Sequence, residues 1–407
     1  GKDKAGQVKP LSAFDSEKPE DLWSYLQEDE KNTGGKVLAI PHNGNLSGGR
    51  MFALQDSQGR PLTRDYAERR MRWEPLYEVT QYKGDGEAHP FLSPTDEFAD
   101  FETWDKANLA MLEPHKDAYY LTEYARSALK LGLQQGAALG VNPFKFGMIG
   151  ASDSHTGFAQ TAENNFLGKY GVASPNPANR DRWQKRWPPV EGTVAKVMGW
   201  ESQSGGLAAV WARENTRAAI WDAMQRKEVY ATTGSRMRVR MFGGFAFDPA
   251  HAQAGDMAAI GYARGVPMGG TLQAAPPGVA PSFLLAATKD PDGANLDRIQ
   301  VIKGWLDGEG VLQERVYDVA AADNRTIIRG VVSRAVGSTV DVDNATYANS
   351  IGDAQLLAFW EDPEFDAGQA AFYYARVIEI PTPRWTAYDQ ARLGAEMTRE
   401  VPMELQE

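Results

Sequence analysis

The sequence predicts an α/β fold over residues 1–240, followed by an antiparallel β-sandwich-like region over residues 241–407. Through about residue 235, short apolar runs typical of strands alternate with segments of helical periodicity, which favours a parallel α/β layout. Beyond that point, strand patterns follow one another with only turn signals between them, as in antiparallel sheets. A length of 407 residues fits two domains, or one large barrel with an addition.

Helical periodicity marks three segments of the first region, at residues 17–29, 118–139 and 214–228. Pro19 lies near the start of the first segment, and acidic residues occupy its first turn. Gly140 directly follows the second segment and is expected to end that helix. In the third segment, apolar side chains recur on one face.

Four apolar runs predict strands in the same region, at residues 37–40, 75–80, 146–149 and 229–234. The runs at 37–40 and 146–149 are expected to be buried. Between the last two runs, residues 170–206 are rich in Pro, Asn, Gly and Trp and show no periodicity. We therefore expect a long, lid-like loop there, and long loops in compact domains are usually functional or disordered.

The second region contains six expected strands, at residues 238–242, 283–287, 298–302, 326–328, 355–360 and 372–380. Turn signals separate them, for example Asp-Pro-Asp-Gly at residues 290–293 and Asp-Gly at residues 307–308. Residues 250–281 are rich in Ala, Gly and Pro, and we expect them to form an insertion or loop.

The composition excludes several classes of function. The formal net charge is -11 and no basic block stands out, which argues against a nucleic-acid partner. A local metal centre can nevertheless hold an anionic small substrate in an acidic protein. The absence of cysteine excludes disulfides, thiolate metal sites and cysteine nucleophiles. No run approaches 18 apolar residues, so no membrane span is expected.

Two of the five histidines lie just after apolar strand runs. His42 follows the run at 37–40, whereas Asp153 and His155 follow the run at 146–149. Side chains two residues apart on an extended backbone point to the same side, so Asp153 and His155 are expected to bind one ion or adjacent ions. This spacing also fits an Asx turn with a surface histidine, and His42 alone fits a loop histidine held by the backbone. Two such motifs together favour a metal site.

Other polar residues near these motifs are candidates for catalysis or binding. Glu78 lies among apolar neighbours on an expected strand, so its carboxylate must be paired, bind metal or be exposed. We assign Glu78 and Lys83 as candidate catalytic residues. The candidate substrate-binding residues are Asn43, Asn45, Arg50 and His89. Lys83 and Arg50 would hold an anionic group, although both also fit solvated loop charges.

Several motifs resemble the DUF3604 family, and the resemblance covers nearly the whole chain. They lie at residues 11–23, 40–47 (IPHNGNLS), 77–84 (YEVTQYKG), 150–155 (GASDSH), 214–217 (ENTR), 290–305 and 375–385. That family is similar to the PHP (polymerase and histidinol phosphatase) superfamily. The resemblance implies a distorted (β/α)₇ barrel with two or three metal ions. It also implies metal-ligand roles for His42, Asp153 and His155, and it places Glu78, Gln81 and Lys83 in a motif beside that site.

The sequence departs from the PHP pattern in one respect. PHP domains open with a His-x-His strand followed by further His and Glu ligands, and this sequence contains no His-x-His. We therefore expect the barrel to be incomplete in this chain, with an N-terminal polypeptide segment completing it. Similar proteins often carry export signals, which favours a periplasmic or secreted location, and otherwise a cytoplasmic one; this sequence shows no such signal.

These observations predict a metal-dependent hydrolase that uses a metal-activated water on a small-molecule substrate, with anionic molecules among the candidates. Mn, Zn and Fe are the metals that suit Asp and imidazole ligands. Phosphate esters are the favoured substrates, by analogy with the PHP superfamily alone. Two alternatives stay open: an amide or ester hydrolase with the same metal chemistry, and a non-catalytic glycan- or partner-binding protein with a degenerate barrel.

Overall fold

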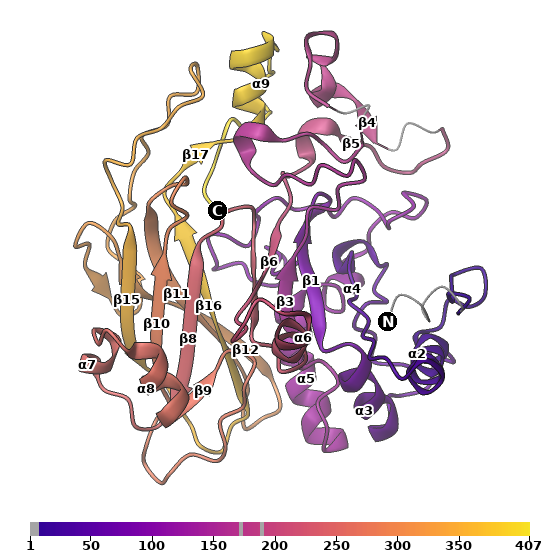
Figure 1. The fold of residues 1–407 in the computed structure, drawn as a ribbon, viewed down its shortest axis with the longest axis vertical. Helices are drawn as coiled ribbons and strands as arrows, with labels where there is room; N and C mark the ends of the chain where they lie inside the picture. The colour runs from indigo at the N-terminus through magenta and orange to yellow at the C-terminus, as the bar shows by residue number, and fades with distance from the viewer. Residues whose placement is uncertain (1–7, 171–173, 188–190) are drawn as a thin grey trace.

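The computed structural model describes residues 8–170, 174–187 and 191–407. Figure 1 shows two parts side by side: helices around short central strands in the first half of the chain, and long antiparallel strands in the second half. The fold is therefore mixed α/β with several antiparallel sheets, and the described strands form no closed barrel. No helix in the described ranges is long and apolar enough to cross a membrane.

The helices of the first half begin and end where local chemistry dictates. The expected first helix is α2, Pro19–Thr33, which starts with proline at its first turn and runs four residues beyond the prediction. Gly34 ends it with a left-handed φ of 66° and donates its N–H to the carbonyl of Glu30. An unpredicted helix, α3 (Arg64–Trp73), starts at Thr63, whose side chain accepts from the N–H of Tyr66.

The expected long helix at 118–139 is instead two helices, α4 (Asp117–Tyr120) and α5 (Ala125–Leu139). The break lies at Thr122, whose hydroxyl donates to the carbonyl of Gly49 and whose own carbonyl accepts from the N–H of Phe52. These bonds to another loop compete with helical hydrogen bonds, so the prediction of one continuous helix was wrong. Gly140, with φ 73°, ends α5 as expected.

A small sheet forms the centre of the first half. Strand β1 (Leu76–Gln81) pairs in parallel with β3 (Gly147–Gly150) and antiparallel with β2 (Gly84–Asp85). Next to β3 lies β7 (Val229–Thr232), which pairs antiparallel with β6 (Leu207–Val210). Along the chain, helix α6 (Arg217–Gln225) connects β6 to β7. A Cβ at Gly206 would lie 2.5 Å from the carbonyl oxygen of Thr232, so only glycine permits this close approach of strands.

The prediction of a buried strand at residues 37–40 was wrong. These residues are only half-buried and belong to no regular strand. Their chain is tied to its neighbours by two backbone bonds, from the N–H of Ala39 to the carbonyl of Trp73 and from the N–H of Glu78 to the carbonyl of Pro41. An apolar run becomes a regular strand only where a neighbouring strand pairs with it along its length. Here Pro41 also lacks the backbone N–H that such pairing would use.

The second half contains two antiparallel sheets that share one hydrophobic core. The first has the order β15-β10-β8-β9 and the second the order β12-β11-β16. Their bounds are β8 Arg238–Gly244, β9 Gly265–Pro267, β10 Ser282–Thr288, β11 Leu296–Leu306, β12 Leu312–Ala321, β15 Gln355–Glu361 and β16 Ala371–Glu379. The expected strand at 326–328 is the two-residue β13 (Ile327–Ile328), paired with β14 (Val331–Val332).

Helical and edge elements complete the second half. Two short helices lie within the expected insertion at 250–281, which is therefore partly ordered into regular structure. They are α7 (Pro249–Ala252), which begins one residue before the expected insertion, and α8 (Met257–Arg264). Strand β17 (Thr382–Pro383) pairs with β18 (Glu404–Leu405) on either side of helix α9, Trp385–Leu393.

Residues 171–173 and 188–190 of the expected lid-like loop at 170–206 lie outside the described ranges. The described part of the loop contains only short elements: the strands β4 (Arg186–Trp187) and β5 (Val197–Met198) and three single turns of 3₁₀ helix. Helix α9 packs against this loop, where Arg182 forms a two-bond ion pair with Asp389 at 2.6 and 2.9 Å. The C-terminal helix therefore returns to the first half of the chain (Figure 1).

A buried ionic network joins the two halves. Its centre is Arg126 of α5, which is 1% exposed. The guanidinium of Arg126 donates to Glu87 at 2.6 Å, Asp96 at 2.7 Å and Glu314 of β12 at 3.1 Å. From the other side, Arg376 of β16 donates to Asp96 at 2.6 Å. Burial would raise the pKa of Glu87, but the two guanidinium groups lower it to about 2.

Removing the central cation should destabilise the whole chain. In Arg126→Met, three largely buried carboxylates lose a charged donor, so we expect a loss of about 3–5 kcal/mol in the free energy of unfolding. Urea denaturation followed by far-UV circular dichroism measures it. The matched control is Arg64→Met, because Arg64 forms an exposed pair with Glu68 at 2.8 Å and such pairs contribute about 0–1 kcal/mol. Equal effects of the two substitutions would contradict a central role for the network.

Candidate functional site

The candidate site is built on the segments that follow β1 and β3. Asp153 lies three residues after β3 with a left-handed φ of 51°. Its carboxylate accepts hydrogen bonds from the ammonium groups of Lys83 and Lys169 and lies 3.1 Å from Nε2 of His155. The structure therefore brings Asp153, His155 and Lys83 together, but the backbone at Asp153 is not extended as the prediction assumed.

Lys169 is a residue of this cluster that the sequence did not reveal. It directly precedes the loop at 170–206 and lies 16 residues after Asp153, with no periodicity or motif around it. Its backbone carbonyl accepts from the N–H of His155 at 2.8 Å, so Lys169 holds the Asp153–His155 segment through both backbone and side chain. Only the folded chain places this ammonium beside Asp153.

The charges of the cluster favour an anion. Burial would raise the pKa of Asp153, but hydrogen bonds from Lys169 and Lys83 outweigh that effect and hold the pKa below its usual value. Burial also lowers the pKa of Lys83, against the opposing influence of Asp153. Two ammonium groups therefore share one carboxylate in a largely buried position, which leaves excess positive charge at the site.

Glu78 of β1 is a carboxyl group without a partner for one of its oxygens. Its Oε1 atom is buried and forms no hydrogen bond within the described residues. Burial, and secondarily the charge of Asp153, raise the pKa of Glu78 to about 7 against the opposing charges of Lys83 and Lys169. Buried polar atoms are usually paired, so this oxygen is expected either to carry a proton or to meet a ligand.

The loop that carries His42 reaches the cluster through a chain of hydrogen bonds. Asn43, with a left-handed φ of 59°, accepts at Oδ1 from Nε2 of Gln81 at 2.6 Å. Gln81 in turn accepts from the N–H of Lys83 at 2.6 Å. The imidazole of His42 is exposed, and its Nδ1 lies 3.5 Å from the carbonyl of Ile40, a weak contact that leaves the ring accessible.

The other predicted binding residues have different surroundings. Asn45 is buried and donates to the carbonyls of Lys83 and Trp104 at 3.0 Å each, so it supports the Lys83 segment rather than facing a substrate. Arg50 is exposed, and no ion pair of its guanidinium is found in the described chain.

His89 is buried and both of its ring nitrogens are engaged within the fold. Nε2 lies 3.0 Å from the carboxylate of Asp105, and Nδ1 accepts from the N–H of Phe91 at 3.1 Å. The ring also stacks on Tyr120 with centroids 4.0 Å apart. These contacts give His89 a structural role in positioning its loop, and they leave no ring nitrogen for a substrate.

The donor atoms fit a metal ion in part. Within the described ranges, no group of three or more His, Asp or Glu residues is close enough to hold one ion. Asp153 and His155 do present a carboxylate and an imidazole side by side, a chemically suitable pair. The unpaired oxygen of Glu78 nearby is a further possible donor. To hold a metal ion, Asp153 and His155 would therefore need additional ligands.

The raised pKa of Glu78 predicts a pH-dependent effect of Glu78→Gln on stability. Between pH 4.5 and about 7, folded wild-type protein retains a proton that the unfolded chain loses, so raising the pH destabilises the wild type relative to the variant. The free energy of unfolding of Glu78→Gln minus that of wild type should rise across this window, by up to about 3 kcal/mol. Urea denaturation with EDTA present measures it, and Glu17→Gln, at an exposed position, is the control. A difference that is constant with pH would contradict the assignment.

Comparison with known proteins identifies the family of this chain. A sequence model of the family described as "Protein of unknown function (DUF3604)" matches residues 1–407. No curated protein and no solved structure matches the chain. Since the family match spans the full sequence, the chain belongs to the DUF3604 family.

Proposed function

We propose that this chain forms part of a metal-dependent hydrolase site that acts on phosphate esters. The observation that carries the proposal is the carboxylate of Asp153, which two ammonium groups and an imidazole surround beside the unpaired oxygen of Glu78. Clusters of titratable groups with shifted pKa values are typical of catalytic sites. We further propose that the first half belongs to a PHP-like barrel and that the two antiparallel sheets form a β-sandwich-like domain.

Asp153, His155 and His42 would hold the metal. A bound divalent ion would lower the pKa of a water molecule and polarise the oxygen of the scissile group. The proposal includes ligands from outside this set, because three such donors do not meet in the described residues. The PHP resemblance identifies their type, a His-x-His strand, and the proposed source is an N-terminal polypeptide segment.

The lysines support an anionic substrate. Lys83 and Lys169 are 5% and 7% exposed, so an anion that reached them would be largely shielded from water. Ammonium groups are common ligands of phosphate oxygens. Asp153 carries one negative charge against these two positive charges, and a dianionic phosphate ester would compensate the excess. A neutral amide or carboxylic ester would not, which ranks the amide or ester hydrolase below the phosphoesterase.

Glu78 would act on the proton of the attacking water. A carboxyl group with a pKa of about 7 is half ionised near neutral pH, so it can accept a proton from water and return one to a leaving group. Its Oε1 atom has no competing hydrogen bond in the described chain. Asn45 and Gln81 would keep Lys83 in place through its backbone.

A non-catalytic binding protein remains the second candidate, and one observation favours it. The lysines that surround Asp153 neutralise a metal-ligand carboxylate, as expected for a degenerate site. Its glycan-binding form finds less support: sugar-stacking tryptophans should be exposed, yet no tryptophan is among the large exposed hydrophobic residues of the described chain. A degenerate site would bind an anion without turnover.

The test of catalysis compares substrates and variants. With the proposed N-terminal segment included and Mn²⁺ or Zn²⁺ added, we expect hydrolysis of aryl phosphate esters in preference to aryl carboxylic esters. Asp153→Asn and His155→Ala should each lower kcat/KM by at least about 100-fold, the size of effect seen when metal-site residues are changed. His251→Ala is the control, since His251 lies beside Asp248 on the short helix α7. Phosphatase activity unchanged in both site variants would sink the hydrolase proposal.

The two lysines should act mainly on substrate binding. Lys169→Met removes one ammonium from the site and should raise KM for a phosphate ester by about tenfold or more, since each charged hydrogen bond contributes about 1.5–3 kcal/mol. Lys106→Met is a matched control, because Lys106 pairs with Glu201 outside the cluster. Steady-state kinetics over a range of substrate concentrations separates KM from kcat. An unchanged KM would exclude Lys169 from substrate binding.

A further inference from the structure

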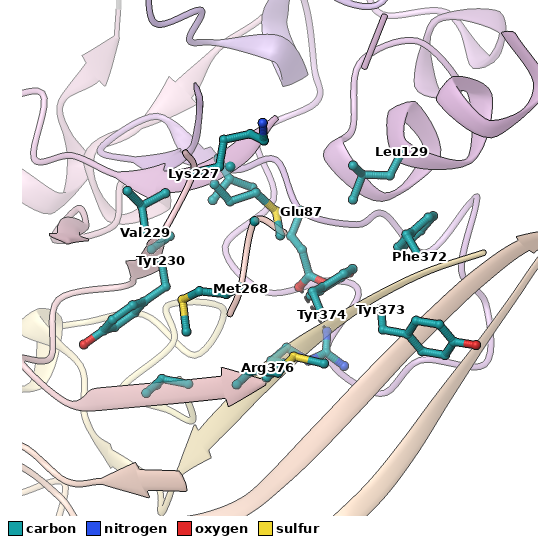
Figure 2. Close-up of a pocket in the computed structure, with 18 of the residues that line it drawn as sticks. Glu87, Leu129, Lys227, Val229, Tyr230, Met268, Phe372, Tyr373, Tyr374 and Arg376 are labelled. Atoms are coloured by element: carbon teal, nitrogen blue, oxygen red, sulfur yellow. Dashed lines mark hydrogen bonds and ion pairs between the residues drawn. The ribbon is translucent and has the colours of Figure 1, made fainter. Parts of the chain in front are cut away.

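A cavity of about 570 Å³ lies between the two halves, apart from the Asp153 cluster. Figure 2 shows the side chains around it: Leu129 of α5, Val229 and Tyr230 of β7, Phe372 of β16, and Met268, which follows β9. Small-molecule sites commonly have volumes of roughly 300–1,000 Å³ and lie between domains. The cavity therefore has the size and position of a ligand site.

Most of the lining is apolar and adaptable. Four methionines contribute to it: Met148, Met237, Met241 and Met268. Methionine side chains have three rotatable bonds and a polarizable sulfur, so they fit apolar ligands of different shapes. Gly269 also lines the cavity with a left-handed φ of 80°, where an added Cβ would lie 2.2 Å from the carbonyl oxygen of Lys227. This close approach fixes the backbone of Lys227.

Two lysines supply unpaired positive charge to this apolar lining. Lys145 and Lys227 both line the cavity and are half-buried, and neither ammonium forms an ion pair with a carboxylate in the described chain. The ammonium of Lys145 donates to the hydroxyl of Thr271. Burial lowers the pKa of both lysines, and the charge of Lys145 lowers that of Lys227 further. Half-buried like charges without a counter-ion are costly, so the site favours an anion.

The end of helix α6 fixes the backbone of Lys227. Its φ is 62°, the left-handed conformation in which a helix commonly ends, and Lys227 directly follows the C-cap residue Arg226. The N–H of Glu228 donates to the carbonyl of Ala223 at 3.0 Å, which closes the helix end. Here β7 begins two residues later, and the loop around Gly269 packs on the Lys227 backbone.

The remaining ionisable groups of the cavity do not neutralise the positive charge of Lys145 and Lys227. Glu87 and Arg376 pair with each other at 3.1 Å. Burial raises the pKa of Asp85 to about 8, so this carboxyl is mostly neutral at pH 7. Burial likewise raises the pKa of Glu407 well above its usual value. In Figure 2, Lys227 lies at one edge of the cavity, across from Arg376.

We propose that this cavity binds a small molecule with an apolar body and one anionic group, such as a medium-chain carboxylate, and that Lys145 and Lys227 bind the anionic group. The apolar side chains of β7, β8 and β16 would bury the body of the ligand. A sulfate or phosphate monoester of an apolar alcohol has the same two features. This inference is independent of the proposed hydrolase function.

Isothermal titration calorimetry with defined probes tests the proposal on the full chain. Decanoate should bind with one site per chain, decanol at least tenfold more weakly because it lacks the charge, and acetate not measurably because it lacks the apolar body. Decyl sulfate and decyl phosphate then distinguish the anionic group. Equal affinity for decanoate and decanol would overturn the assigned lysines, and no binding of decanoate below its micellar concentration would overturn the site.

Variants locate the binding. Lys145→Met and Lys227→Met together should weaken decanoate binding at least tenfold and leave decanol binding unchanged. Lys31→Met is the matched control, because Lys31 is exposed on α2 and 3.9 Å from Glu28. Lys83→Met should retain wild-type affinity, which separates this cavity from the Asp153 cluster. Decanoate affinity lost in Lys83→Met but kept in the double variant would contradict the proposal. If the double variant unfolds, the decanoate–decanol comparison on wild type still decides the outcome.

Discussion

The structure depends on the ionic network around Arg126. Its three carboxylates come from two separate places: Glu87 and Asp96 lie in the loop after β2, and Glu314 lies in β12. Arg376 of β16 closes the network from the second half. Buried charges are tolerated only when each has partners, so the two halves must meet in one arrangement. That arrangement fixes the loop after β2 and also forms one wall of the cavity between the halves.

The two carboxyl groups of the candidate site have opposite pKa shifts. Asp153 is ionised because two ammonium groups surround it, whereas the pKa of Glu78 is raised because burial and the charge of Asp153 disfavour its ionised form. One carboxylate is thus a fixed charge and the other a group that exchanges protons near neutral pH. Hydrolases use such pairs to separate substrate binding from proton transfer. The same lysines would also hold an anion if the site had lost catalysis, so binding alone does not establish turnover.

The sequence predicted the elements whose pattern is local. Strands β8, β10, β11, β15 and β16 have apolar or alternating residues between clear turn signals, and the structure confirms them. Strand β12 was missed because polar residues such as Glu314 and Arg315 interrupt its pattern, and Glu314 is polar because it binds Arg126. The run at 37–40 shows the opposite error: it is apolar, but its strand partner depends on the rest of the fold.

The site was predictable only where residues lie close in sequence. Spacing alone brought Asp153 and His155 together, and the apolar neighbours of Glu78 indicated that its carboxylate is under constraint. Lys169 gave no signal, because its position beside Asp153 arises from the path of a loop without periodicity. His89 was predicted to bind substrate because of its residue type. Its actual contacts with Asp105 and Tyr120 depend on tertiary packing. The most direct test of the account is calorimetric titration of the metal-free protein, with the proposed N-terminal segment included, with Mn²⁺ or Zn²⁺. The account predicts at least one bound ion per chain, with affinity at least tenfold weaker in Asp153→Asn; no bound ion, or equal affinity in the variant, would contradict it.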